Sequence, residues 1–179
     1  MVKKILLGIG IVVVIFAVYF GYLLAANRIL SPAEIVKTEV NGAKISVSYS
    51  RPFKREREIF GGLVPYDRYW RTGANEATEI TFSKDVLFGT KNVEAGSYWL
   101  YSIPGKQEWT VVLNSELGQW GVPGPNYDKD VLRIKVQATS VPEPLEQFKI
   151  SLVPAPKDNL IKLTLSWDKT LVVVPLEVI

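Results

Sequence analysis

The side chains best suited to binding chemistry gather in one segment, residues 51–76, which reads RPFKREREIFGGLVPYDRYWRTGANE. Its last part, WRTGANE at 70–76, brings together an indole ring, a guanidinium, an amide and a carboxylate. Aromatic faces stack on flat groups, and guanidinium groups bind carboxylates and phosphates in a bidentate manner. The segment therefore indicates recognition of a polar ligand, either a hydroxyl-rich glycan or an anionic metabolite.

A second aromatic segment, Ser115 to Lys129, carries two large rings among glycines and prolines that stiffen and turn the chain. A pocket would form between the two segments if both lie at the same end of the domain. The binding hypothesis accordingly assigns a ligand site to these residues: Arg51, Arg57, Arg68, Trp70, Arg71, Asn75, Glu76, Trp120 and Tyr127.

A structural role accounts for the same residues. A long ordered loop must satisfy its own carbonyl groups, and arginine and asparagine side chains commonly do so. On this alternative Trp70 plugs one end of the core, and the second segment is a hydrophobic lid.

The sequence contains no histidine and no cysteine. This excludes Ser-His-Asp triads, cysteine nucleophiles, disulfides, and zinc or copper sites built from nitrogen and sulfur ligands. Carboxylates remain, and a glycosidase needs two of them about 5–10 Å apart. Candidates are Glu56, Glu58, Asp67 and Glu76, all close to arginines in the sequence.

A carboxylate-dependent hydrolase acting on cell-envelope glycans is therefore the alternative function, and a non-catalytic binding domain is preferred. Asp128 and Asp130 alone fall far short of a calcium-binding loop. We assign no catalytic residue, no metal ligand and no cofactor. A protein partner is the other option, and it would need an exposed apolar patch or an unpaired edge strand.

Period-two alternation and turn residues predict an all-β domain beyond residue 30. Asn41-Gly42 predicts a hairpin, and Pro175 marks the last strand as an edge strand or a bulged one. The expected fold is an antiparallel β-sandwich of jelly-roll or Greek-key type, with a closed barrel as the alternative. The predicted strands are 35–40, 43–50, 77–82, 86–88, 97–103, 109–114, 131–138, 148–153, 160–167 and 171–178.

An uncharged apolar run extends from Ile5 to Ala26. As a helix it is about 33 Å long, enough to cross a hydrocarbon core of about 30 Å. Lys3 and Lys4 precede it, so the N-terminus is expected in the cytoplasm. The expected organisation is a cytoplasmic stub (1–4), a transmembrane signal-anchor helix (5–26), a linker (27–34) and the β-sandwich domain (35–179).

The domain is thus expected outside the cytoplasmic membrane, in the periplasm or outside the cell, on a single-pass anchor. A cleaved signal peptide is the competing interpretation, although Leu24-Ala25-Ala26 matches a cleavage site only in part. Residues 1–30 hold three of the 21 basic residues and none of the 18 acidic ones, so the remaining chain has equal numbers of each. This neutrality argues against nucleic-acid binding.

Several long motifs resemble a widespread family of exported bacterial domains that is classed as a domain of unknown function. They are YSRP at 49–52, IFGGLVPY at 59–66, WRTGANEAT at 70–78, ITFSKDV at 80–86 and DVLRIKV at 130–136. The resemblance covers nearly all of 31–179 and implies an all-β fold and export, with no activity, substrate or catalytic residue. The sequence departs from the family at 55–60, where REREIF replaces the more usual RGRxIF and Glu56 stands in place of a glycine.

Overall fold

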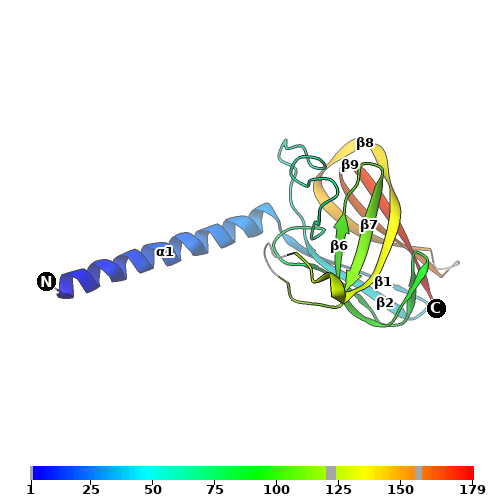
Figure 1. Ribbon diagram of the computed structural model, residues 1–179, viewed down its shortest axis with the longest axis horizontal. Coiled ribbons are helices and arrows are strands. Elements are labelled where there is room, and N and C mark those ends of the chain that lie inside the picture. Colours follow the sequence, from blue (N-terminus) through cyan, green and yellow to red (C-terminus); the bar gives the residue numbers. More distant parts are fainter. Residues whose placement is uncertain (1, 120–123, 156–158) are drawn as a thin grey trace.

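The computed structural model describes residues 2–119, 124–155 and 159–179 (Figure 1). One helix precedes a compact β domain. The elements are α1 (Val2–Leu30), β1 (Ala33–Val40), β2 (Ala43–Ser50), β3 (Thr78–Phe82), β4 (Val86–Phe88), β5 (Lys91–Val93), β6 (Gly96–Ile103), β7 (Glu108–Asn114), the 3-10 helix η1 (Tyr127–Lys129), β8 (Asp130–Ala155) and β9 (Leu160–Val178).

Within the described residues, nine strands form one antiparallel open sheet in the order β1-β2-β3-β6-β7-β8-β9-β4-β5. The prediction of an all-β antiparallel domain is confirmed. The strands are hydrogen-bonded into one continuous sheet, so the division into two stacked sheets and its jelly-roll or Greek-key type stay predictions.

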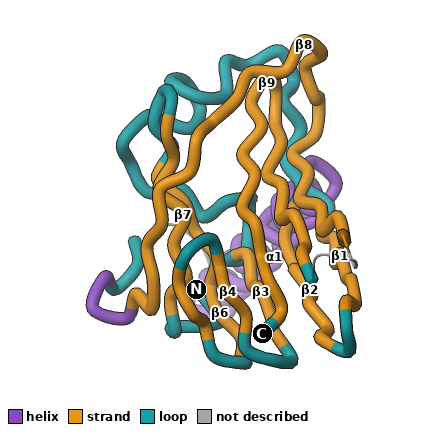
Figure 2. Tube along the Cα trace, turned by 90° about the vertical axis from the view of Figure 1, so that its right-hand side faces the viewer, coloured by secondary structure: helices purple, strands orange, loops and turns teal. Residues whose placement is uncertain are grey.

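The sheet is strongly curved, as the two views show (Figures 1 and 2). Most of its buried apolar side chains form one large cluster, and Ala77, Trp99, Tyr101 and Val112 form a second, smaller one. Val47 in β2, Leu100 in β6 and Leu163 in β9 belong to the large cluster. The chain after β2 also reaches the second half of β8, because the Phe148 amide donates to the Pro52 carbonyl at 2.9 Å. Burial of apolar surface in this common core stabilises the fold in a chain that has no disulfide.

The strands β8 and β9 are long and bent, and each contains two of the predicted strands. Pro142 and Pro144 lie between the two predicted strands, within β8, where its register with β9 shifts between Ser140 and Lys149. A proline cannot donate to the ladder, so the strand bends there and then resumes its pairing. The predicted breaks are therefore bends inside continuous strands.

The last strand was predicted to be an edge strand or a bulged one, and the first of these alternatives is wrong. In the sheet β9 lies between β8 and β4, and the outermost strands are β1 and β5. Pro175 is tolerated because pairing with β8 ends at Val172, whereas pairing with β4 begins at Leu176. No ladder amide is required between these two positions.

The predicted Asn41-Gly42 hairpin is confirmed. Val40 pairs with Ala43, and Asn41 and Gly42 have φ angles of 50° and 75°. Positive φ at both central positions is the type I′ geometry, whose twist matches that of the flanking strands.

The helix α1 extends away from the domain (Figure 1). Gly8–Leu30 is long and apolar enough to cross a membrane, and signal sequences share this property with membrane anchors. The helix continues to Leu30 and β1 begins at Ala33. Both elements thus extend into the predicted linker, and only Ser31 and Pro32 separate them.

Candidate functional site

The loop 51–76 lies on the side of the domain from which α1 extends (Figure 1). The start of the second segment is held to the residues that directly follow this loop. The Ala77 amide donates to the Gln119 carbonyl at 2.9 Å, and the Gly118 amide donates to Glu79 Oε1 at 3.3 Å.

Hydrogen bonds hold residues 70–78 to β6, and further hydrogen bonds form within the segment. Trp70 and Ser102 exchange two backbone hydrogen bonds, of 2.8 and 3.0 Å. The Thr72 hydroxyl lies 2.8 Å from the Ser102 hydroxyl, and the Thr78 hydroxyl donates to the Thr72 carbonyl at 2.7 Å. These buried contacts satisfy the backbone of a segment without regular structure and hold it rigid.

Trp70 plugs this end of the core, as the structural alternative expects. Its side chain is only 9% exposed. Its indole stacks on Trp167, with ring centroids 5.9 Å apart and planes inclined by 19°. Phe148, Phe60 and Trp109 meet it edge-on, with centroids 5.1 to 6.0 Å away. The remaining exposed part of the ring forms the floor of a pocket.

This pocket, the arginine pocket, has a volume of about 380 Å³. Its walls come from the end of α1, the loop 51–76 and the indole floor. Among the described residues, three guanidinium side chains and no carboxylate line it. The lining residues are Asn27, Leu30, Ser31, Pro52, Arg55, Arg57, Leu63, Val64, Trp70, Arg71, Gly73, Ala74, Asn75 and Trp167.

The three arginines retain donors for a ligand. Arg57 donates to the Lys54 and Phe53 carbonyls, and Arg71 Nη1 donates to the Asn75 carbonyl at 2.7 Å. Among the described residues, the Arg55 side chain makes no hydrogen bond and no ion pair. Since each guanidinium carries five N–H groups, most of their donors stay available.

The structure brings together four of the predicted site residues: Arg57, Trp70, Arg71 and Asn75. It adds Arg55, which the sequence analysis placed in the loop but did not assign to the site. Arg55 has a φ of 49° and follows no strand or helix period, so the sequence carries no signal for the direction of its side chain.

Two predicted arginines lie elsewhere. Arg51 donates from Nε to the Phe148 carbonyl at 3.2 Å and pairs with Glu34 at 2.8 Å, so it joins the loop to β8 and β1. Arg68 is exposed and does not line the pocket. Trp120 lies outside the described residues.

Glu76 is in a neighbouring cavity of about 390 Å³ at the end of α1, lined also by Arg28, Asn27, Asn75, Leu24 and Ala25. Its carboxylate forms an ion pair with Arg28, with Nη1 donating to Oε2 at 3.1 Å. The contact joins the last turn of the helix to the loop.

The sequence model of a protein family described as "Protein of unknown function (DUF2911)" matches residues 31–176. The chain belongs to this family. No curated protein and no solved structure matches it. The DUF2911 match begins at Ser31, directly after α1, and includes every wall of the arginine pocket except Asn27 and Leu30.

The backbone at Arg55 and Glu56 has an unusual geometry. Arg55 and Glu56 have φ angles of 49° and 58°, and the Arg57 amide donates to the Lys54 carbonyl at 3.2 Å. This is a type I′ turn, in which glycine is favoured at the second central position. The glycine that the resemblance leads one to expect at position 56 thus has a geometric reason, and this chain builds the same turn with glutamate.

The acidic residues of the loop do not converge on a cleft. Glu56, Glu58 and Asp67 are exposed, and none of them lines either cavity. Glu76 is the one carboxylate among the described residues lining these two cavities. The pair of facing carboxylates that a glycosidase requires is therefore not assembled there.

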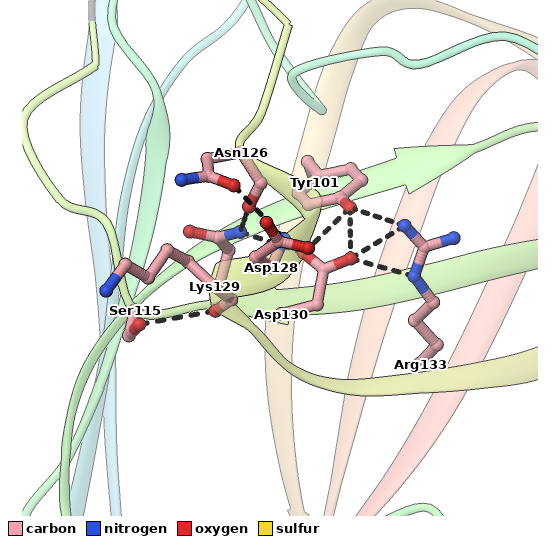
Figure 3. Close-up of polar contacts among 8 residues, drawn as sticks. Tyr101, Ser115, Asn126, Asp128, Lys129, Asp130 and Arg133 are labelled. Carbon is pink, nitrogen blue, oxygen red and sulfur yellow. Dashed lines mark hydrogen bonds and ion pairs between the residues drawn. The ribbon is translucent and has the colours of Figure 1, made fainter.

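The DUF2911 domain contains a second polar cluster that sequence reasoning missed (Figure 3). The Asp130 carboxylate, 8% exposed, accepts from Asn114 Nδ2 at 2.8 Å and pairs with Arg133 Nη2 at 2.7 Å. The Tyr101 hydroxyl lies 2.9 Å from both carboxylate oxygens. Burial, followed by the hydrogen bond to Asp130, raises the pKa of Tyr101.

Tyr127 belongs to this second cluster and not to the arginine pocket. Its ring lies 5.1 Å from the Arg133 guanidinium carbon, a cation–π contact. Asp130 had been considered only as a metal ligand paired with Asp128. Its partners come from β6, β7 and β8, and no spacing in the sequence brings Tyr101 to Asp130. Because its donors and acceptors satisfy one another, the cluster fixes the start of β8.

Proposed function

We propose that this DUF2911 protein is a membrane-anchored extracytoplasmic binding domain, and that its arginine pocket binds a polar anionic ligand. The observation that carries the proposal is the composition of the pocket: three guanidinium groups and no carboxylate around an indole floor. A pocket of this size is in the usual range for small-molecule sites, about 300–1,000 Å³.

The electrostatics favour an anion over a neutral glycan. Arg55, Arg57 and Arg71 place three positive charges around one cavity without a compensating acid in its lining. Guanidinium groups bind phosphate and carboxylate through paired, charge-assisted hydrogen bonds. A bound anion would therefore relieve the mutual repulsion of the three charges as well as accept their free donors.

We also propose that α1 is retained as the anchor. Its last residues support this proposal: Asn27 and Leu30 line the pocket, and Arg28 pairs with Glu76. Comparing the mass of the mature chain with that of the sequence tests retention, because cleavage after Ala26 would remove the whole apolar run. A mature chain that begins at Asn27 would contradict this part of the proposal.

A thermal-shift experiment on the full chain in a neutral detergent tests the anion site. Inorganic phosphate, glycerol 3-phosphate and citrate are compared with the neutral sugar maltose. A ligand at 100-fold excess over its Kd adds about 2.7 kcal/mol to the free energy of unfolding. We expect stabilisation by at least one anion and none by maltose.

The variant Arg55→Gln supplies the sharpest comparison, because the Arg55 side chain makes no hydrogen bond or ion pair among the described residues that its loss would break. Arg68→Gln removes the same charge from an exposed position outside the pocket and is the matched control. Stabilisation should fall in Arg55→Gln and persist in Arg68→Gln. A response to maltose alone, or a shift unchanged in Arg55→Gln, would refute the anion site.

A further inference from the structure

We infer that the anion is the phosphate-bearing headgroup of a lipid in the membrane that α1 occupies. This inference rests on the proposed function, and it names the source of the ligand. It follows from the depth of the pocket relative to the helix, from the apolar side chains on its rim, and from the kinds of group that line it.

The depth of the pocket is set by α1. The uncharged run ends at Ala26, and the helix continues without interruption to Leu30, which lines the pocket. Four further residues of helix add about 6 Å. The headgroup region on each side of a bilayer is roughly 5–8 Å thick, so a helix that spans the hydrocarbon core delivers the pocket wall to headgroup depth.

Apolar side chains are exposed on this same side of the domain. Leu63, on the pocket lining, is 47% exposed, and Ile29, at the end of the helix, is 75% exposed. Exposed leucine and isoleucine are unfavourable in water but are stabilised at the boundary between headgroups and acyl chains. Leu63 lines the same pocket as the three arginines, which gives this part of the surface the amphipathic character of an interfacial site.

The lining of the pocket matches the two parts of a lipid headgroup. Arg55, Arg57 and Arg71 supply N–H donors for phosphate oxygens, while Leu63 and the Trp70 indole supply apolar surface for the adjoining carbon atoms. Inorganic phosphate would contact only the arginines. A glycerophosphate headgroup that remains attached to its acyl chains would use both and would enter from the membrane side.

Native mass spectrometry of the full chain in neutral detergent tests this inference directly. Phosphatidylglycerol and phosphatidylcholine are added in separate experiments, and the lipid retained by each chain is counted. The variants are Arg55→Gln, the double variant with Arg71→Gln, and the control Arg68→Gln. Glycerol 3-phosphate, a phosphate monoester, is added as a soluble competitor for the phosphodiester of the lipid.

We expect wild type and Arg68→Gln to retain phosphatidylglycerol in preference to phosphatidylcholine. Retention should fall at least about tenfold in the double variant, since it loses two charged donors. Unfolding temperatures without lipid show whether the double variant is folded, and Arg55→Gln alone replaces it if it is not.

Each other outcome overturns something specific. If glycerol 3-phosphate stabilises the protein through Arg55 but phosphatidylglycerol is not retained, the ligand is a soluble anion: the lipid inference fails and the proposed function stands. If phosphatidylglycerol binds the double variant as well as wild type, the lipid binds elsewhere, and the inference fails. If neither compound binds, the lipid inference fails, and the proposed function fails with it when inorganic phosphate and citrate also give no stabilisation.

Discussion

Trp70 and Trp167 stack with their ring centroids 5.9 Å apart, one from the loop that follows β2 and the other from β9. The stack joins the segment that carries the arginines to the core of the sheet. It therefore makes the floor of the pocket part of the buried core, and it links the site to the stability of the fold.

Replacing Trp70 tests this link. Trp70→Ala should lower the free energy of unfolding by about 3–5 kcal/mol, because it removes a buried ring and leaves a cavity. Trp70→Phe should lower the free energy of unfolding by less, because an aromatic ring remains in the core. Urea unfolding of the full chain in detergent measures the change. The control Leu117→Ala removes an exposed side chain and should stay within about 0.5 kcal/mol. Equal effects of Trp70→Ala and Leu117→Ala would contradict the role of Trp70 in the core.

The turn at Arg55-Glu56 should be stabilised by glycine. Glu56 is exposed and adopts a φ of 58°, a region that costs residues other than glycine about 1–2 kcal/mol. Replacing Glu56 by glycine removes this cost, but the greater conformational freedom of glycine in the unfolded chain offsets part of the gain in stability. Glu56→Gly should therefore raise the free energy of unfolding by about 0.5–1 kcal/mol.

Glu58 offers the matched comparison in the same loop. It is also exposed, but its φ is not positive, so Glu58→Gly has only the entropic cost and should lower stability. Chemical denaturation of both variants shows whether each substitution raises or lowers the free energy of unfolding. If Glu56→Gly is as destabilising as Glu58→Gly, the left-handed geometry of the turn is wrong.

Alkaline pH should weaken the domain through its buried tyrosines. Burial raises the pKa of Tyr69 from 10.0 to about 12. A group whose pKa is raised on folding contributes stability that is complete below its unfolded pKa and is lost as the pH rises through its folded pKa. Stability should therefore decline between about pH 10 and pH 12.

The variant Tyr69→Phe keeps the ring packed against Trp99 and removes the titrating hydroxyl. Its free energy of unfolding should change little at pH 8 and decline less steeply than that of wild type above pH 10. An identical alkaline decline in Tyr69→Phe and wild type would show that Tyr69 does not contribute.

Asp130 should matter more for stability than its neighbour Asp128. Asp130→Asn replaces an acceptor that serves Asn114, Tyr101 and Arg133, and should cost about 1–3 kcal/mol. Asp128 is exposed, so Asp128→Asn should be nearly neutral. Thermal unfolding in detergent compares the two variants, and a larger loss in Asp128→Asn would contradict the arrangement in Figure 3.

The elements that the sequence predicted are those set by local chemistry. Asn41-Gly42 determines a hairpin through its own φ angles, and alternation along 43–50 identifies the buried side of β2. The bends of β8 were not predictable in this way. Pro142 ends a strand in most contexts, and only the long-range pairing with β9 carries β8 past it.

The candidate site also contains some residues that local chemistry predicts and others that only long-range contacts place. Trp70 and Arg71 were predicted because residue types alone suggest recognition chemistry. The sequence did not separate Arg55, which lines the pocket, from Arg51, which pairs with Glu34, because side-chain direction in an irregular loop depends on tertiary contacts. The partnership of Tyr101 with Asp130 is a contact across the sheet and has no local signal.

Side-chain NMR of the arginines tests anion binding at its proposed position most directly. The full chain, labelled with nitrogen-15 in neutral detergent micelles, is titrated with glycerol 3-phosphate while the Nε–H resonances are followed. We expect those of Arg55, Arg57 and Arg71 to shift together with one Kd, while that of Arg68 stays in place. If Arg68 shifts with the same dependence, or if the pocket arginines do not respond, the arginine pocket is not the anion site.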